Sequence, residues 1–283
     1  MLSQFPEITA TAFSDAAAGS VPPSPPPAKT TVAGKAQSIV KSILHGVSED
    51  DSPFQEVQDT HSKLLARGKY VHELQIHDVK PEAWDDYLGL VGERYTKVAE
   101  DPAFKVKLFG SWTTEIGDLD QAVHVWEYNH YPGYTETKAL LAQDLAHREF
   151  EKKLRPMLRQ RKNQIMLEFA FWAGSPPAAH GGVYELRTYQ LKPGRLLEWE
   201  TEWRRGLEAR RKHVQPIGAW FSQLGHLNYV HHMWVYPDLQ TRKERREAAW
   251  QVEGWSQTVY KTVRLIDRMQ GFILRANSFS PLK

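Results

Sequence analysis

The stretch VYELRTYQLKPG (Val183–Gly194) predicts a strand that runs into a helix, and the chain contains a second version of it, VHELQIHDVKPE (Val71–Glu82). In both stretches apolar and polar residues alternate, which is typical of a strand whose two faces meet different surroundings. A Lys-Pro pair follows each strand, and proline suits the first turn of a helix. The chain therefore carries the same structural unit twice.

The repeat continues through two further strands in each copy. Second strands are predicted at Lys107–Trp112 and Gln215–Gly225, where a Gly-x-Trp spacing recurs. Third strands are predicted at Ala122–Tyr128 and Tyr229–Tyr236, and their matching triplets are His124, Trp126 and Tyr128 in the first copy and His232, Trp234 and Tyr236 in the second. Because side chains alternate between faces along a strand, each triplet shares one face of its sheet.

Each copy ends with a helical region and a fourth strand. The helical regions are predicted at about Tyr134–Lys162 and Leu239–Met269, with breaks at Pro156 and Gly254. The fourth strands are predicted at Gln164–Trp172 and Gly271–Phe279. The resulting order, β-α-β-β-α-β, is that of a ferredoxin-like fold.

A sheet with helices on one side leaves its other apolar face uncovered, and two such sheets can cover each other. The sequence thus predicts an α+β protein whose tandem ferredoxin-like (βαββαβ) repeats form a pseudo-twofold α+β barrel of the dimeric α/β-barrel type. The expected boundaries are 1–58 for a mostly disordered N-terminal segment, 59–173 for the first repeat, 174–182 for a linker and 183–283 for the second repeat.

Composition excludes several classes of protein. The net charge of +2 favours neither a nucleic-acid binder nor a protein for acidic substrates. Without cysteine the chain has no disulfide, no thiolate nucleophile and no iron–sulfur cluster. The basic runs at His147–Lys162 and Arg242–Arg246 are typical of solvated helix faces. The DLDQA stretch at Asp118–Ala122 lies in a loop, whereas a phosphatase aspartate belongs at the end of a parallel strand.

The N-terminal segment offers two interaction elements. A basic amphipathic helix is predicted at about 32–46, and it suits a membrane surface, an import receptor or a groove on its own protein. The next element is an acidic stretch with an aromatic and an aliphatic residue, which could add a strand to the sheet edge of an autophagy modifier. Its candidate residues are Glu49, Asp50, Asp51, Phe54 and Val57. A solvated acidic linker is the alternative interpretation.

The repeated polar residues define a candidate cavity. As repeat mates, His124 and His232 could meet across the barrel, together with the mates Glu73 and Glu185. Along with Trp126, Trp234, Tyr128 and Tyr236 they could line a ligand cavity between the two sheets, or they could be buried groups that hydrogen-bond one another. No catalytic residue and no cofactor are predicted. No metal site is predicted either, since adjacent His231 and His232 point to opposite faces of a strand and cannot hold one ion.

Four stretches, together with VYELRTYQLKPG, carry a resemblance to a known family. They read DQAVHVWEY, RKNQIMLEFAFW, FSQLG and VHHMWVYPDLQTRKERREAAWQVEGWSQTVYKTV. They resemble the NIPSNAP proteins over most of the chain, from about Asp59 to its end. The resemblance implies a mitochondrial protein, chiefly of the matrix, that binds autophagy receptors or ubiquitin-like modifiers in mitochondrial homeostasis and mitophagy without catalysis.

Two function classes follow from these patterns. The first is a non-catalytic scaffold of the NIPSNAP type, with homo-oligomerisation and peripheral membrane contact through the N-terminal helix as further expectations, and with no nucleic acid as partner. The alternative is a small-molecule-binding barrel or monooxygenase-like enzyme that uses a cavity between the sheets. A barrel filled by side chains would favour the scaffold.

Overall fold

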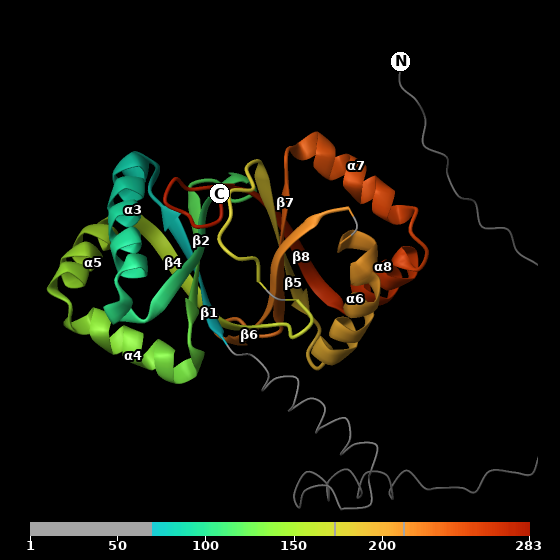
Figure 1. The fold of residues 1–283 in the computed structure, drawn as a ribbon, viewed down its shortest axis with the longest axis horizontal. Coiled ribbons are helices and arrows are strands. Elements are labelled where there is room, and N and C mark those ends of the chain that lie inside the picture. The colour runs from blue at the N-terminus through green and yellow to red at the C-terminus, as the bar shows by residue number, and fades with distance from the viewer. Residues whose placement is uncertain (1–69, 173, 212) are drawn as a thin grey trace, which may run out of the picture. The chain divides into compact units, whose positions relative to one another are not determined.

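The structure is a computed structural model that describes residues 70–172, 174–211 and 213–283. In these residues eight strands close into one barrel in the order β1-β3-β2-β8-β5-β7-β6-β4 (Figure 1). The predicted amphipathic helix at about 32–46 and the motif around Phe54 and Val57 lie outside the described residues.

The elements follow the predicted repeat. In the first half they are β1 (Val71–Val79), α3 (Trp84–Glu100), β2 (Val106–Ile116), β3 (Gln121–Tyr128), α4 (His130–Gln143), α5 (Leu145–Met157) and β4 (Leu158–Glu168). In the second half they are β5 (Val183–Leu191), α6 (Leu196–Arg211), β6 (Gln215–Leu224), β7 (Tyr229–Tyr236), α7 (Leu239–Trp250), α8 (Trp255–Val263) and β8 (Ile266–Ala276). Short 3-10 turns at Pro81–Ala83 and Pro102–Phe104 precede and follow α3.

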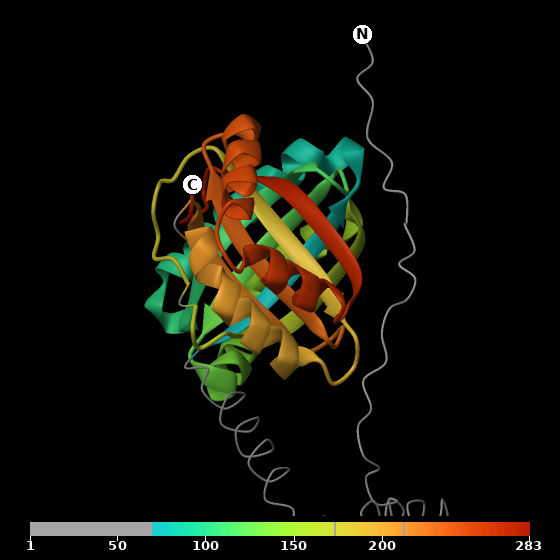
Figure 2. The same cartoon turned by 90° about the vertical axis from the view of Figure 1, so that its right-hand side faces the viewer.

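Two seams join the halves into the barrel. Strand β2 pairs with β8, and strand β4 pairs with β6, both antiparallel. Helices α3, α4 and α5 cover the outside of the first half, and α6, α7 and α8 cover the second, as Figures 1 and 2 show. The predicted barrel of two ferredoxin-like repeats is therefore confirmed.

Both faces of the strands are buried, one inside the barrel and one beneath the helices. Strand β3 is almost wholly buried along its length, and so is its repeat mate β7. The barrel interior is packed with side chains such as Trp112, Val125, Trp220 and Met233. The sheets thus cover each other's apolar faces, and side chains rather than open space fill the gap between them.

Of the two predicted breaks in the helical regions, the one at Gly254 is confirmed and the one at Pro156 is wrong. Gly254 does separate α7 from α8, with a φ of 82° that favours glycine. In the first half the break falls at Asp144, whose carboxylate accepts hydrogen bonds from the backbone of Ala146 and His147 and so begins α5. Pro156 instead lies inside the last turn of α5. The fourth strands also begin earlier than predicted, at Leu158 and Ile266.

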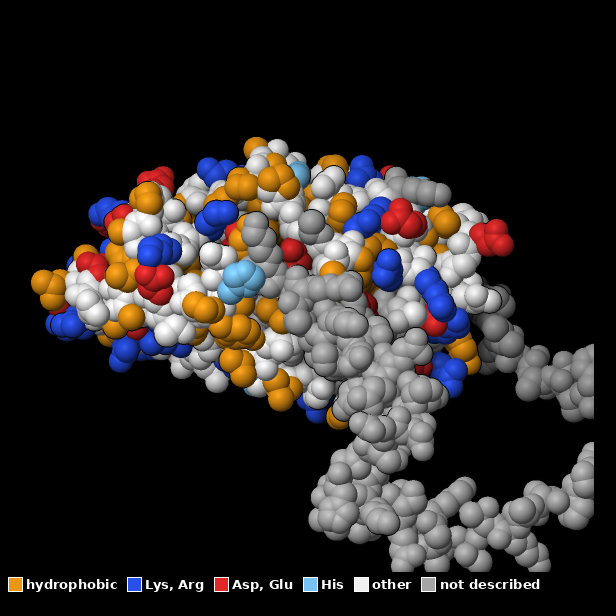
Figure 3. Space-filling view, turned by 60° about the horizontal axis from the view of Figure 1, so that its bottom comes forward, with side chains coloured by type: hydrophobic (Ala, Val, Ile, Leu, Met, Phe, Trp, Pro, Cys, Tyr) orange, Lys and Arg blue, Asp and Glu red, His pale blue; other side chains and the backbone are white. Residues whose placement is uncertain are grey.

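The surface carries no continuous basic stretch on the face in Figure 3, where lysine and arginine side chains lie among acidic and hydrophobic ones. Among the described residues, no helix is both long enough and apolar enough to cross a membrane.

Candidate functional site

The residues predicted to line a cavity between the sheets lie on the opposite face of their strands, beneath the helices. His124 contacts Tyr87 and Tyr95 of α3. His232 contacts Trp203 of α6. Since α3 and α6 cover opposite sides of the barrel (Figure 1), the prediction that the two histidines meet across it is wrong.

The tryptophan and tyrosine residues of the two triplets also lie on the outer face of the barrel. Along β3 and β7 the inward positions hold residues such as Val123, Val125, Met233 and Val235. The outward positions hold the histidine and aromatic triplets, since Trp126, Tyr128, Trp234 and Tyr236 belong to the layers beneath the helices. The structure therefore divides the candidate residues into two separate groups, one in each half.

The first group centres on Glu73, which is 1% exposed. Its carboxylate accepts hydrogen bonds from the hydroxyl of Tyr128 at 2.7 Å, from Nζ of Lys138 at 2.8 Å and from Nδ2 of Asn163 at 2.7 Å. Burial alone would raise the pKa of Glu73, but Lys138 and the hydrogen bonds outweigh it and lower that pKa. The charged carboxylate thus fixes the positions of its three donors.

A cavity of about 530 Å³ opens beside Glu73. It lies between the outer face of β1, β3 and β4 and the helices of the first half. Its walls include the apolar side chains of Tyr95, Trp126 and Phe150, and its polar groups include Glu73, His77 and Lys138. Its volume lies within the range typical of small-molecule sites. We call it the first-repeat pocket.

A chain of hydrogen bonds runs from this pocket into the protein. Nδ1 of His77 lies 2.8 Å from the hydroxyl of Tyr87, which lies 2.8 Å from Nε2 of His124. Nδ1 of His124 lies 2.8 Å from the hydroxyl of Ser111, which accepts from Nδ2 of Asn277 at 2.8 Å. Burial lowers the pKa of His77 to about 4 and the pKa of His124 well below its usual value, so both imidazoles are neutral near pH 7.

One direction of donation gives each donor from the Ser111 hydroxyl to the Tyr87 hydroxyl an acceptor. If the Ser111 hydroxyl donates to His124, the Nε2–H of His124 donates to Tyr87, and the Tyr87 hydroxyl donates to His77. In the reverse direction the hydroxyl proton of Ser111 would have no acceptor among the hydrogen bonds of the described residues. His77 therefore presents an N–H at Nε2, on a residue that lines the first-repeat pocket.

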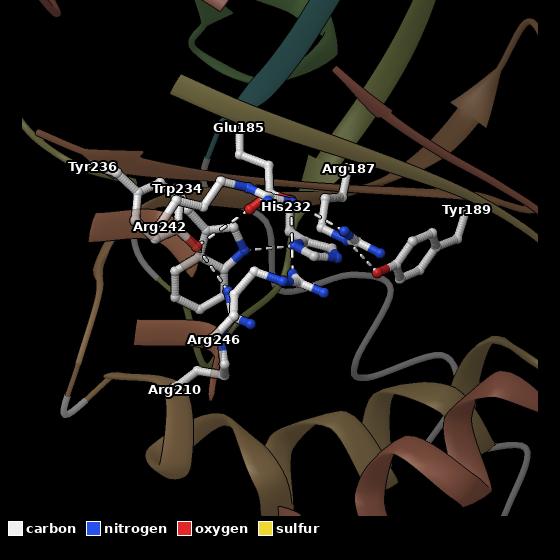
Figure 4. Close-up of polar contacts among 9 residues, drawn as sticks. All are labelled: Glu185, Arg187, Tyr189, Arg210, His232, Trp234, Tyr236, Arg242 and Arg246. Carbon is white, nitrogen blue, oxygen red and sulfur yellow. Dashed lines mark hydrogen bonds and ion pairs between the residues drawn. The ribbon is translucent and has the colours of Figure 1, made fainter. Parts of the chain in front are cut away.

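The second group centres on Glu185, also 1% exposed. Oε1 accepts from Arg242 at 2.5 Å and from Arg187 at 3.0 Å, and Oε2 accepts from the hydroxyl of Tyr236 at 3.2 Å (Figure 4). Burial opposes its ionisation, yet the hydrogen bond from Arg242 and the nearby arginines lower the pKa of Glu185 to about 2. The matched pairs Glu73–Tyr128 and Glu185–Tyr236 thus occupy equivalent places, with different cations around them.

Trp234 and His232 complete the second group. Trp234 stacks edge-on against Trp172 with ring centroids 4.7 Å apart, and its Nε1 donates to Nδ1 of His232 at 2.7 Å. In the described part of the chain no cluster of three or more potential ligands could hold a metal ion. Both groups have the chemistry of binding sites, in which fixed polar groups sit in an aromatic wall.

Several residues of these groups were missed from sequence. Lys138 lies on α4, and Asn163 lies on β4 just before the predicted start of the fourth strand, so spacing along the matched strands could not reveal them. His77 lies on β1 four residues after Glu73, on the same face of that strand, and this spacing was an available signal. Arg242 and Arg246 were interpreted as part of a solvated run, but their side chains are only 27% and 33% exposed and turn toward Glu185. Their spacing of four residues, which places both on one helix face, was the available signal.

Known proteins resemble this chain in sequence and fold. A model of the NIPSNAP family matches residues 72–173 and 184–281. The chain is 39% identical to Protein NipSnap homolog 2 of Danio rerio, over 88% of this chain and 92% of that protein. It is 42% identical to the human homolog 2 over 80% of each chain. Among solved structures, a putative monooxygenase from Fusobacterium nucleatum superposes with a TM-score of 0.58 over 75% of this chain and 94% of that one, at 13% identity, which is a likeness of fold.

Proposed function

Since this chain belongs to the NIPSNAP family, we propose that it is a non-catalytic binding protein that holds a small amphipathic molecule in the first-repeat pocket. The observation that carries this proposal is the carboxylate of Glu73, which already accepts three hydrogen bonds. A carboxylate held in this way is a poor general base, because its hydrogen bonds stabilise the charged form. It positions Lys138 and Tyr128 at the wall of a pocket of ligand size.

The packed barrel supports binding outside the barrel over the alternative of a site between the sheets. Trp112 and Trp220 are at most 1% exposed and fill the interior. The first-repeat pocket instead combines an aromatic wall with a few fixed donors, among them Lys138 and the Nε2–H of His77. We expect its ligand to pair an apolar body with a hydrogen-bond acceptor.

Native mass spectrometry of the purified protein tests this function. We expect a retained small molecule, and we expect Ala142→Phe to reduce its retention, because Ala142 lines the pocket and a ring there would occupy part of it. The matched control is Ala139→Phe, which places the same ring on an exposed position of the same helix outside the pocket. Equal retention by the two variants, or no ligand in the unmodified protein, would contradict the proposal.

The wider role that we propose is scaffolding in mitochondrial homeostasis and mitophagy. It rests on the resemblance to NIPSNAP proteins, and it includes a location chiefly in the mitochondrial matrix and partners among autophagy receptors or ubiquitin-like modifiers. Homo-oligomerisation and membrane contact through the N-terminal helix belong to the same proposal. A pulldown with an autophagy modifier, before and after Phe54→Ala and Val57→Ala, tests the motif, and unchanged binding would remove those residues from it.

An enzyme working in the first-repeat pocket is the second candidate. The chain of hydrogen bonds from His77 through Tyr87 to His124 favours it, because such a chain contains the groups needed to relay a proton. Incubation of the protein with its retained ligand separates the two functions. An unchanged ligand mass supports binding, and a product with a new mass supports the enzyme.

A further inference from the structure

Four arginines surround the single carboxylate of Glu185 in the second half. Arg187 comes from β5, Arg210 from α6, and Arg242 and Arg246 from α7. Two of them hydrogen-bond Glu185, whereas Arg246 reaches it only at 3.7 Å and Arg210 donates to the hydroxyl of Tyr236 at 2.8 Å. Figure 4 shows them converging on one place, which thus carries an excess of positive charge.

This excess is costly in a buried place unless an anion balances it. Arg210 is 4% exposed, and its Nε is buried without a hydrogen-bond partner among the described residues. Burial lowers the pKa of Arg246, and the neighbouring arginines Arg187, Arg210 and Arg242 lower it too, against the opposing effect of Glu185. Glu185 alone therefore leaves the arginines undercompensated.

His232 adds a donor whose proton position is fixed. The indole N–H of Trp234 can only donate, so Nδ1 of His232 must accept from it. The histidine is neutral, since burial lowers its pKa well below the usual value, and its remaining proton therefore lies on Nε2. That Nε2–H is buried, and no acceptor in the described residues faces it. The residue is 1% exposed and lines a cavity.

The cavity connects these groups to the surface. It measures about 100 Å³, the share of about three water molecules, and its polar wall includes Arg187, Arg210, Arg246 and His232. The wall also includes three apolar side chains that remain partly exposed, Trp250 at 52%, Val263 at 44% and Met269 at 44%. The bottom of the site is thus positively charged, and its opening is apolar. We call it the Arg–His pocket.

We propose that the Arg–His pocket binds an organic acid that carries an apolar chain, with its carboxylate against Arg246, Arg187 and the Nε2–H of His232. The guanidinium groups and the imidazole donor supply hydrogen bonds to the acid. Trp250, Val263 and Met269 cover the beginning of the chain. The small base of the pocket accepts an acid head, and its apolar opening suits a ligand with a hydrocarbon body.

The first half shows that the arginine excess is particular to the second. At the equivalent carboxylate, Glu73, one lysine and one asparagine replace the arginines. The Arg–His pocket is therefore distinct from the first-repeat pocket, and the proposal that it binds an organic acid does not depend on the function proposed above.

Isothermal titration of the full chain with sodium octanoate tests the site. We expect one octanoate per chain, and we expect Arg246→Gln to weaken its binding about tenfold or more, as the loss of a charge-assisted hydrogen bond would. Arg246 is partly exposed and makes one long contact, so the variant should fold. Lys243→Gln is the matched control, since it removes the same charge from the same helix at a residue whose side chain is 63% exposed.

Titrations with other ligands show which parts of octanoate the pocket recognises. Octan-1-ol and inorganic phosphate should bind far more weakly than octanoate, because one lacks the acid and the other lacks the chain. Met269→Glu, which places a carboxylate at the opening, should also weaken octanoate binding. Equal affinities of Arg246→Gln and Lys243→Gln, absent octanoate binding, or phosphate or octanol binding as tightly as octanoate would overturn the proposal.

Discussion

At the scale of single residues, the two halves share a hydrogen-bonded glutamate–tyrosine pair but differ in the cationic side chains around it. Glu73 with Tyr128 and Glu185 with Tyr236 occupy matched positions, and each tyrosine donates to its carboxylate. Lysine and asparagine surround the first pair, while arginines surround the second. Because the hydrogen-bonded pair remains while the cations differ, the pair anchors each helix–sheet layer and the cations set the chemistry of each pocket.

The buried histidines make stability depend on pH. Burial lowers the pKa of His231 from 6.5 to about 4, and its two ring nitrogens lie 2.8 Å from Gln164 and 2.9 Å from Thr188. As pH falls below 6.5, the unfolded chain takes up a proton that the folded histidine takes up only near pH 4. The contribution of His231 to stability is therefore full above pH 6.5. It is lost as pH falls toward 4, by about 3 kcal/mol.

His231→Gln should flatten this loss between pH 6.5 and pH 4. The measurement is the free energy of unfolding in urea at several pH values. His226→Gln, at an exposed histidine, is the control and should retain the slope of the unmodified protein. If the curves of the two variants had the same slope, the assignment to His231 would fail.

At the scale of elements, strand β2 and its mate β6 bend over a tryptophan. The pairing of β2 with β3 shifts between Leu108 and Gly110, and that of β6 with β7 shifts between Pro216 and Gly218. A side chain on Gly110 would come within 2.0 Å of the ring of Trp112, and one on Gly218 within 2.3 Å of Trp220. The Gly-x-Trp spacing of the sequence thus lets each indole fold back over its own strand inside the barrel.

Gly110→Val should therefore destabilise the protein by about 1–3 kcal/mol, as overpacking of a core does. Thermal unfolding with a calorimeter measures the change. Gly89→Ala is an informative control, because Gly89 lies in α3 with open space around it, and alanine there should stabilise the helix by about 0.5–1 kcal/mol. A Gly110→Val protein as stable as the unmodified one would show that Trp112 does not need the glycine.

The order of elements was predictable because each copy repeats the same strand and helix patterns. The inward face was not predictable, since Val125 on one side of β3 and Trp126 on the other are both apolar, so alternation could not choose between them. The break at Asp144 was missed because its capping role depends on backbone geometry, whereas Pro156 fits within the last turn of α5. The pockets depend on α4, α5 and α7, whose inward residues no strand pattern reveals.

At the scale of the whole molecule, the halves depend on each other. Each leaves one face of its sheet bare, and the two seams bring these faces together around a core that includes Trp112 and Trp220. Outside the barrel each half keeps its own helices and its own pocket. The architecture therefore couples the halves in stability while it separates their binding sites, so each pocket could take a different ligand.

This coupling predicts that the halves stay together when the chain between them is cut. A protease site inserted between Pro176 and Pro177, which are both exposed, would allow the cut in the folded protein. The seams β2–β8 and β4–β6 and the shared core remain, so the fragments should elute as one species in size-exclusion chromatography and unfold in one transition. The uncut protein with the same insertion is the control. Fragments that separate without denaturant would show that the linker, and not the burial of the two sheet faces, holds the barrel closed.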